Sequence, residues 1–369
     1  MRFSCTQENL SRCLNITSRV ASRAGNLPIL SYVQIKATPE GIELKATNLE
    51  VGVTCRLRGK MEEVGEFTVP AKLFTEFVAS LPKERVDLEL KEQELKVSCG
   101  RHSTSIKGLS ASEFPLIPQI ENGSPWEVST SDLVEGLDQV LFAISPTESR
   151  PEISGGLISL KNGNLIIAGT DSYRLAEKKL IAQGGEGEVR VIVPLRALQE
   201  LSRICAQEQT EHPRVKLTVS TNQLAVSLPT IEFVTRLIDG QYPDYRAILP
   251  AKFGTQIILG RGELSNALKA AGLFSKTGVY DVALEFFPDQ KKVGIESVSA
   301  QTGAYQSALE GEVSGAPAKI AYNWKYLLDG IVALKSEKVE LKATDASSPT
   351  LLTEEKSEDY FYVVMPIKE

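Results

Sequence analysis

The segment Val191-Ile-Val-Pro-Leu-Arg-Ala-Leu-Gln-Glu-Leu201 indicates the architecture of the chain, because its pattern occurs three times. The other two copies are Phe67-Thr-Val-Pro-Ala-Lys-Leu-Phe-Thr-Glu-Phe77 and Ile320-Ala-Tyr-Asn-Trp-Lys-Tyr-Leu-Leu-Asp-Gly330. Each copy has an apolar segment typical of a short strand, then a cation, then apolar residues at helical spacing. The cations are Lys72, Arg196 and Lys325, and they lie 124 and 129 residues apart, about one third of the 369-residue chain. The sequence therefore predicts three copies of one domain.

The length of the chain agrees with several domains, since 369 residues exceed what one hydrophobic core usually organises. Two turn-rich segments without helical periodicity, near residues 115–125 and 247–254, separate the copies. We therefore expect domains at residues 1–121, 122–250 and 251–369. A period of this length indicates domain triplication and not a solenoid.

Each expected domain contains two helices and about eight strands. The second helices are predicted at Ala71–Leu81, Leu195–Cys205 and Trp324–Leu334. The first helices are predicted after Thr6, over the apolar stripe from Leu133 to Ile144, and near Gly262–Phe274. Helices packed on antiparallel sheets make the fold class α+β.

Composition excludes several classes of protein. The apolar fraction is 42%, and no apolar run approaches the roughly 20 residues of a membrane span. The N-terminus lacks the apolar core of a signal peptide, so we expect a cytoplasmic protein with no membrane partner. The five cysteines are scattered, and there are only two histidines. We therefore expect buried reduced thiols, and no metal or cofactor.

Positive charge recurs on the predicted helices of a chain whose formal net charge is −6. Arg196 and Arg203 are seven residues apart, and Arg12, Arg19 and Arg23 are separated by seven and four. Such faces fit a phosphate backbone bound without regard to base sequence, and the lack of an aromatic platform favours duplex. The alternative is that they are ordinary solvated helix faces. The repeat itself predicts contacts with DNA at Lys72, Arg196, Arg203 and Lys325, with Arg19 on the first helix.

The second copy departs from this pattern. Its first helix carries Glu135 and Asp138 and no cation. The three copies therefore share a pattern of helices and strands but differ in the charge of their first helices.

Catalytic signatures are missing from the sequence, which contains no Walker A sequence, G-x-G-x-x-G loop or G-x-S-x-G elbow. Asp171 in Gly169–Ala176, and Asp239 and Asp244 in Ile238–Arg246, are candidate catalytic carboxylates. Both stretches are turn-like, and Asp is a common turn residue. We expect no enzyme, because no positioned acid–base pair is evident.

Six stretches resemble one family, the bacterial sliding clamps that form the beta subunit of DNA polymerase III. They are Leu27-Pro-Ile-Leu30, Thr68-Val-Pro-Ala71, Glu113-Phe-Pro115, Gly169-Thr-Asp-Ser-Tyr-Arg-Leu-Ala176, Leu237-Ile-Asp-Gly-Gln-Tyr-Pro-Asp-Tyr-Arg246 and Tyr362-Val-Val-Met-Pro366. The resemblance implies a head-to-tail homodimer, closed as a ring around duplex DNA, that tethers the replicative polymerase and other proteins carrying a clamp-binding motif. A clamp-loader ATPase would open the ring.

The resemblance also implies a groove for partner peptides between the second and third copies. Its residues would be Ile153, Thr170, Ser172, Tyr173, Arg174, Leu175, Pro243, Ala247, Ile248, Pro349, Val363, Val364, Met365, Pro366 and Ile367. Met and aliphatic residues suit a surface that accepts several partners. Val363 and Val364 are equally compatible with a buried last strand. Ala247 departs from the arginine familiar in some relatives.

The dimer contact implied by the resemblance joins Thr104 and Ile106 of one copy to Leu273 and Phe274 of the other. Leu273-Phe274 is also compatible with core. DNA contacts are implied at the loops around Arg23 and Arg150. Two other interpretations stay open: a peptide-binding scaffold that does not encircle DNA, and an enzyme with an unfamiliar site.

Overall fold

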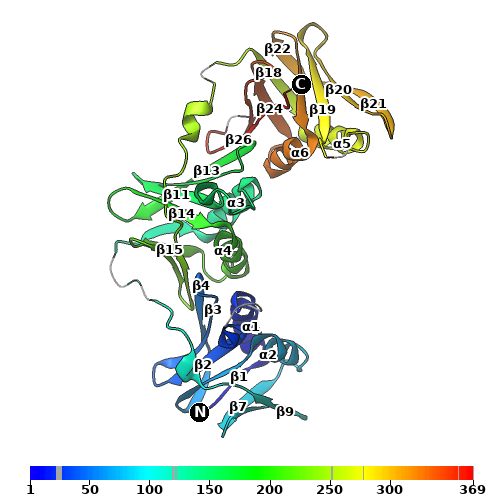
Figure 1. The fold of residues 1–369 in the computed structure, drawn as a ribbon. Coiled ribbons are helices and arrows are strands. Elements are labelled where there is room, and N and C mark those ends of the chain that lie inside the picture. The colour runs from blue at the N-terminus through cyan, green and yellow to red at the C-terminus, as the bar shows by residue number, and fades with distance from the viewer. Residues whose placement is uncertain are drawn as a thin grey trace. The chain divides into compact units, whose positions relative to one another are not determined.

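The computed structural model describes residues 1–21, 27–118, 120, 123–250, 252–276, 278–355 and 357–368. Helices and antiparallel sheets alternate along the chain, which confirms the α+β class (Figure 1). The chain forms two compact units. The first unit comprises Met1–Ser131, Gln183–Glu186 and Glu200–Leu237, and the second comprises Asp132–Ala182, Gly187–Gln199 and Ile238–Glu369. The middle third of the chain therefore contributes to both.

The first unit begins with strand β1 (Arg2–Thr6) and helix α1 (Gln7–Val20). The Thr6 side chain caps the helix by accepting a hydrogen bond from the Asn9 amide at 3.2 Å. Leu10 and Leu14 lie on the face of α1 that is buried, as their spacing predicts. Helix α2 (Ala71–Ala79) packs beside α1.

Two antiparallel sheets complete the first unit. The smaller sheet has the order β5-β1-β7-β8-β9, with β5 (Gly59–Glu63), β7 (Arg85–Lys91), β8 (Glu94–Cys99) and β9 (His102–Lys107). The larger runs β10-β15-β16-β17-β4-β3-β2-β6. Its strands are β2 (Tyr32–Thr38), β3 (Gly41–Thr47), β4 (Val51–Leu57), β6 (Gly65–Pro70), β10 (Trp126–Ser129), β15 (Arg214–Val219), β16 (Gln223–Leu228) and β17 (Ile231–Arg236). The pairing of β17 with β4 makes one continuous sheet from strands of the first and second sequence copies.

The second unit repeats this plan with a sheet of order β14-β11-β12-β13-β26-β25-β24-β18-β22. Its strands are β11 (Gly155–Lys161), β12 (Asn164–Thr170), β13 (Arg174–Gly184), β14 (Val189–Pro194), β18 (Thr255–Gly260), β22 (Glu312–Gly315), β24 (Lys338–Ala343), β25 (Thr350–Glu354) and β26 (Tyr360–Val364). Here β13 pairs with β26, so this sheet joins the second copy to the third.

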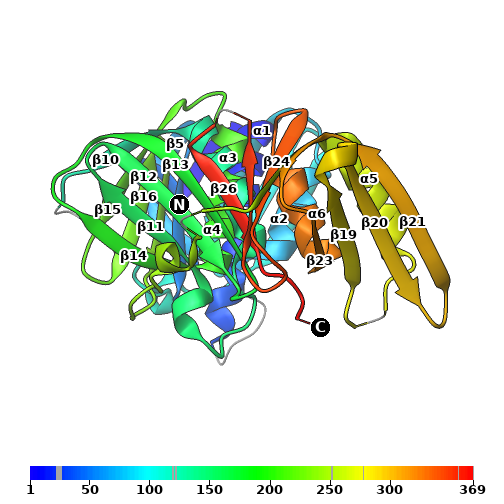
Figure 2. The ribbon, with the colours of Figure 1, turned by 90° about the horizontal axis from the view of Figure 1, so that it is seen from above.

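A smaller sheet, β21-β20-β19-β23, also lies in the second unit. Its strands are β19 (Asp281–Phe287), β20 (Lys292–Ser299), β21 (Gly303–Glu310) and β23 (Ala318–Asn323). Helix α5 (Arg261–Gly272) packs on β19, β20 and β21, and α6 (Trp324–Ala333) packs on α5 and β23 (Figure 2). Helices α3 (Thr130–Val140) and α4 (Leu195–Glu208) contribute residues to both units.

Helix ends differ from the expected ones by a few residues. Helix α2 ends at Ala79 and not at Leu81, because Pro82 disfavours helix just before it and Ser80 Oγ donates to the Phe77 carbonyl at 2.7 Å. Helix α4 continues past Cys205 to Glu208, where the His212 amide donates to the Glu208 carbonyl at 2.8 Å. Beyond Val140, the apolar stripe of α3 continues in a 3-10 turn. Hydrophobic periodicity thus predicted the position of each helix more accurately than the residue at which the helix ends.

Candidate functional site

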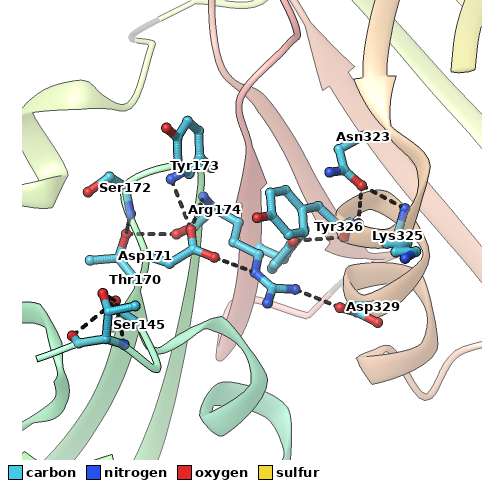
Figure 3. Close-up of polar contacts among 12 residues, drawn as sticks. Ser145, Thr170, Asp171, Ser172, Tyr173, Arg174, Asn323, Lys325, Tyr326 and Asp329 are labelled. Carbon is cyan, nitrogen blue, oxygen red and sulfur yellow. Dashed lines mark hydrogen bonds and ion pairs between the residues drawn. The ribbon is translucent and has the colours of Figure 1, made fainter. Parts of the chain in front are cut away.

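A tight turn, Thr170–Arg174, joins β12 to β13 and forms the centre of the candidate site (Figure 3). Thr170 Oγ1 donates to the Arg174 carbonyl at 2.7 Å and accepts from the Ser172 amide at 3.1 Å. Asp171 Oδ1 accepts from the amides of Tyr173 and Arg174 at 2.9 and 3.0 Å. Asp171 is therefore occupied in building the turn, as the turn-like sequence of this stretch predicts, and this role weakens the alternative of a catalytic carboxylate.

Arg174 fixes this turn against the third sequence copy. Its Nε donates to Asp171 Oδ2 at 2.9 Å, and its Nη1 donates to Asp329 Oδ2 on α6 at 2.6 Å. The guanidinium carbon lies 4.4 Å from the ring centroid of Tyr326 and 5.6 Å from that of Phe142. Burial alone lowers the pKa of Arg174, but Tyr362, Asp171 and Asp329 outweigh it and raise the pKa above its ordinary value.

Strand pairing brings together two motifs that are far apart in the sequence. Arg174 and Leu175 of β13 lie opposite Val364 and Val363 of β26. The Met365 amide then donates to the Tyr173 carbonyl at 2.9 Å. The stretches Gly169–Ala176 and Tyr362–Pro366 therefore form neighbouring parts of one surface within the second unit.

Residues of both strands, Leu175 and Val363, belong to one buried apolar cluster. Its buried members are Leu157, Ala168, Leu175, Ile192, Tyr242, Tyr245 and Val363. Val363 and Val364 are only 1% and 0% exposed, so both are strand core. Of the two interpretations of these valines, burial in the last strand is therefore the one that the structure shows, and the neighbouring Met365 is half-buried.

The other predicted groove residues differ in exposure. Tyr173 is 63% exposed and stacks on Tyr326, with ring centroids 6.4 Å apart, and Ile248 is 51% exposed. Ser172 and Ala247 are exposed, and Pro243, Pro349 and Ile367 are half-buried. Ile153, Thr170, Leu175 and Pro366 are buried. We call the exposed and half-buried members the rim residues; they include aromatic and apolar side chains that a ligand could contact.

The motif Leu237–Arg246 packs onto the same strand. The Tyr245 hydroxyl and the Arg246 guanidinium both donate to the buried carboxylate of Glu177, the latter at 2.7 Å. Burial and the Glu177 carboxylate raise the pKa of Tyr245. Arg246 thus forms its ion pair with Glu177. The next residue, Ala247, has no charge, so it adds no positive charge to the rim residues.

The exposed cations of the repeat stand in the first turn of α2, α4 and α6. Lys72 pairs with Glu76 at 3.5 Å, Arg196 is exposed, and Lys325 Nζ lies 3.6 Å from the Tyr280 ring centroid. Arg19, in the last turn of α1, is also exposed. These side chains can meet a phosphate without breaking a buried contact.

Arg203 differs from the other predicted DNA contacts. Its side chain is 16% exposed and pairs with Glu200 at 2.9 Å. Its Nη1 and Nη2 donate to the carbonyls of Asn15 and Ile16, each at 3.3 Å. These contacts count against a phosphate contact at Arg203, which instead ties α4 to α1 within the first unit. The helical period placed it with Arg196, but packing between helices decides its partners.

Two loop arginines complete the predicted set. Arg150 is exposed, pairs with Glu152 at 3.1 Å and donates to Ser172 Oγ at 2.9 Å, so it lies beside the Thr170–Arg174 turn. Arg23 lies outside the described residues.

Of the predicted dimer residues, two lie on an edge strand and two directly follow helix α5. Thr104 and Ile106 lie on β9, the edge strand of the smaller sheet of the first unit, with Thr104 half-buried and Ile106 4% exposed. Leu273 follows α5 and is 74% exposed, so it is not core. Phe274 is half-buried and stacks on Tyr305 of β21, with ring centroids 6.1 Å apart.

Three residues next to the turn are absent from the sequence-based prediction. Phe142, Tyr326 and Asp329 all contact Arg174 or Tyr173. Tyr326 and Asp329 lie in Ile320–Gly330, the third copy of the repeated stretch. Membership of that copy is the one feature of the sequence that points to these two residues. Their pairing with residues about 150 positions earlier depends on the tertiary fold.

Other features of the described residues give no competing site. They contain no group of three or more His, Cys, Asp or Glu side chains arranged to hold a metal, and no helix long and apolar enough to cross a membrane. All five cysteines are free thiols and buried. A cavity of about 680 Å³ is lined mostly by charged residues, with Leu180 and Ile181 also in its lining, and its Lys178 is already paired with Glu135 and Asp359.

Comparison with known proteins covers nearly the whole chain. Models of the N-terminal, central and C-terminal domains of the DNA polymerase III beta subunit match residues 1–118, 127–244 and 246–368. The beta sliding clamp of Synechococcus elongatus is 29% identical over 373 residues, covering 100% of this chain and 99% of the relative. The beta sliding clamp of Staphylococcus aureus is 25% identical over 378 residues, with the same coverage.

Solved structures agree. The Pseudomonas aeruginosa sliding clamp bound to griselimycin has a TM-score of 0.95 at 28% identity, covering 100% of both chains. The Thermotoga maritima beta subunit has a TM-score of 0.94 at 26% identity, covering 100% of this chain and 99% of that one. The chain therefore belongs to the DNA polymerase III beta subunit family, the beta sliding clamps, which act as non-catalytic processivity factors in DNA replication.

Proposed function

We propose that two copies of this chain close head to tail into a ring around duplex DNA and tether the replicative polymerase to it. The observation that carries the proposal is the equivalent placement of Lys72, Arg196 and Lys325, all exposed, in the first turns of α2, α4 and α6. A phosphate backbone attracts such cations regardless of base sequence. Contacts of this kind hold a ring on DNA while letting it slide.

Two free sheet edges support the head-to-tail contact. Among the described strands, β9 ends one sheet of the first unit and β21 ends one sheet of the second. An edge strand presents unpaired backbone N–H and C=O groups, which a strand of another chain can pair with. Phe274 stacks on Tyr305 of β21, and the exposed Leu273 directly precedes Phe274, so both supply apolar area for this contact. A contact between unlike edges is heterologous and closes into a ring when its rotation permits.

Processivity then depends on topology more than on affinity. A closed ring leaves DNA only at a free end or by opening, so weak phosphate contacts suffice. Opening requires a separate clamp-loader ATPase, since the sequence contains no nucleotide-binding motif. The domains at 1–121, 122–250 and 251–369 are the proposed units of this ring, and its proposed location is the cytoplasm.

Partner proteins bind, in this proposal, at the surface around the Thr170–Arg174 turn. The exposed Tyr173 and the half-buried Met365 flank the paired strands β13 and β26, and Ile248 adds an exposed aliphatic side chain. That combination suits short apolar peptides from several partners. Griselimycin, which the Pseudomonas clamp binds, is the proposed competitor for this surface.

Retention on DNA tests the mechanism. The protein is loaded onto nicked circular duplex with a clamp loader and ATP, then separated from free protein by gel filtration in high salt. Loader- and ATP-dependent retention that disappears after a restriction enzyme linearises the DNA is the expected result. Equal retention on linear DNA with free ends would contradict encirclement, and peptide binding without any retention would favour the scaffold alternative.

A further inference from the structure

Asp329 is the carboxylate of α6 that contacts the Thr170–Arg174 turn. Its Oδ2 accepts from Arg174 Nη1 at 2.6 Å, although the two residues are 155 positions apart. Asp329 lies outside the proposed peptide groove residues, and its side chain is 46% exposed, against 12% for Arg174. A charge-assisted hydrogen bond to a mostly buried guanidinium has the geometry of an anchor.

The anchor acts on the turn through Arg174. The same guanidinium donates from Nε to Asp171 Oδ2, and Asp171 Oδ1 holds the amides of Tyr173 and Arg174. Asp171 therefore connects Arg174 to the backbone of the turn, and Asp329 connects Arg174 to α6 (Figure 3). A shift of the guanidinium moves the backbone that carries Tyr173.

Aromatic rings make the position of Arg174 specific. Its guanidinium lies over Tyr326, and Tyr326 also stacks on the exposed Tyr173. The main chain of α6 at Tyr326 is fixed separately, because the Tyr362 hydroxyl donates to the Tyr326 carbonyl at 2.8 Å. Asn323 caps the helix by accepting from the Lys325 and Tyr326 amides. Helix α6 is thus a fixed support, and Asp329 is its ionic link to the turn.

We propose that Asp329 is a positioning residue of the peptide surface: it holds Arg174, and through Arg174 the Thr170–Arg174 turn and Tyr173, in the conformation that accepts a partner peptide. This inference rests on the proposed function of that surface. Asp329 itself does not contact the peptide. Loss of its negative charge leaves Arg174 with Asp171 as its only ion-pair partner, beside the Tyr326 and Phe142 rings, and lets the turn sample other positions.

The expected loss of peptide affinity follows from the fraction of molecules that hold the binding-competent conformation. When only a fraction of the molecules holds the competent conformation, the apparent Kd rises by the inverse of that fraction. We expect Asp329→Asn to weaken peptide binding about 5- to 10-fold, corresponding to a competent fraction of about 10–20%. Asp329→Glu retains the charge and recovers most of the affinity.

The test uses the dimer of the 369-residue chain and a fluorescein-labelled peptide that carries the clamp-binding motif of the replicative polymerase of the same genome. Fluorescence anisotropy gives Kd, and unlabelled griselimycin provides a second probe by competition. Glu296→Gln is the matched control, since Glu296 is 42% exposed and pairs with Lys319 at 2.7 Å on the smaller sheet. It should bind the peptide as the parent chain does. Thermal unfolding and sedimentation should be unchanged in all three variants.

A double-mutant cycle separates positioning from a general loss of stability. If Asp329 acts only through Arg174, then Asp329→Asn adds nothing to Arg174→Gln. Additive losses, or an unchanged affinity of Asp329→Asn alongside normal binding by the parent chain, would overturn the positioning role and leave the proposed surface intact. A parent chain that binds neither probe would overturn the proposed surface and, with it, this inference.

Discussion

Arg12 and Glu208 form a two-pronged ion pair across 196 residues of sequence, with Arg12 Nε donating to Glu208 Oε1 at 2.8 Å. A second donor, Arg12 Nη2, reaches Glu208 Oε2 and the Thr230 hydroxyl. Glu208 is 2% exposed, so Arg12 is the main partner of a buried carboxylate. The pair ties α1 to the end of α4 within the first unit.

Arg12→Ala should destabilise the first unit, because it leaves a buried carboxylate without its main partner. Removing one member of a buried pair costs about 3–5 kcal/mol. We place the effect at about 3 kcal/mol, because Arg12 is partly exposed and solvent screens some of its charge. The first transition in urea unfolding measures the change. Arg12→Ala with Glu208→Leu should recover part of the loss, and an equal or larger loss in the double variant would contradict the explanation.

Arg196 and Arg203 should respond differently, although the sequence places them on one helix face. Arg196 is exposed, and Arg203 is held by Glu200 and two carbonyls of α1. Arg196→Ala should weaken binding to duplex and reduce the slope of log K against log salt by about one per DNA-bound cation lost. Arg203→Ala should leave that slope unchanged and lower the unfolding temperature. Equal salt slopes for the two variants would contradict the assignment.

The contrast between these arginines shows what sequence patterns can predict in this chain. Recurrence of Phe67–Phe77, Val191–Leu201 and Ile320–Gly330 predicted the repeated plan and its helices, because periodicity is a local property. The same periodicity gave no information on which cation is exposed. That depends on the packing of α4 against α1, and these contacts join residues far apart in the chain.

The candidate site shows the same limit. The Thr170–Arg174 turn was predictable, because Thr and Asp at close spacing build turns through their own side chains. The pairing of β13 with β26 and the Arg174–Asp329 bond were not, because each joins segments more than 150 residues apart. Burial of Val363 and Val364 likewise required knowing what covers β26.

Leu273→Ala with Phe274→Ala should convert dimers to monomers. Leu273 is 74% exposed in the single chain, and Phe274 stacks on Tyr305 of the edge strand β21. Removing two large apolar side chains from an interface of standard size can cost several kcal/mol when they are its hot spots. Sedimentation velocity at micromolar protein measures the state. The exposed Leu116, 96% accessible, provides a control as Leu116→Ala, which should stay dimeric. A double variant that remains dimeric at all concentrations would refute the interface.

Met365→Ala with Ile248→Ala should abolish most peptide binding and leave the dimer intact. Both side chains belong to the rim, with Ile248 51% exposed, so their loss removes contact area without opening a core cavity. Burial of each side chain by a ligand is worth about 1.5–3 kcal/mol, so we expect the affinity to fall at least tenfold. Anisotropy with the labelled polymerase peptide measures it. Ile181→Ala is the control, because Ile181 is 73% exposed on β13 but follows the turn by seven residues. Unchanged affinity in the double variant would place the peptide elsewhere.

Stability should fall as the pH rises above 9, because buried thiols resist ionisation in the folded chain. Burial, with a contribution from Glu208, raises the pKa of Cys205 from 9.0 to about 12. Between these values the unfolded chain has lost the proton and the folded chain retains it. The unfolded state then binds fewer protons, so the free energy of unfolding decreases with pH, by about 1.4 kcal/mol per pH unit for each such group.

Buried tyrosines such as Tyr245 also have raised pKa values and also make stability depend on pH. Cys205→Ala isolates the part of the pH dependence that comes from Cys205. The variant is less stable than the parent below pH 8, because it lacks a buried side chain that is 0% exposed in the parent. Since alanine has no proton to lose, the difference in unfolding free energy should narrow by about 1.4 kcal/mol by pH 10. Urea midpoints at pH 7.5, 9 and 10, with thiols kept reduced, measure it. Parallel pH profiles for the parent and the variant would show that Cys205 ionises alike in both states.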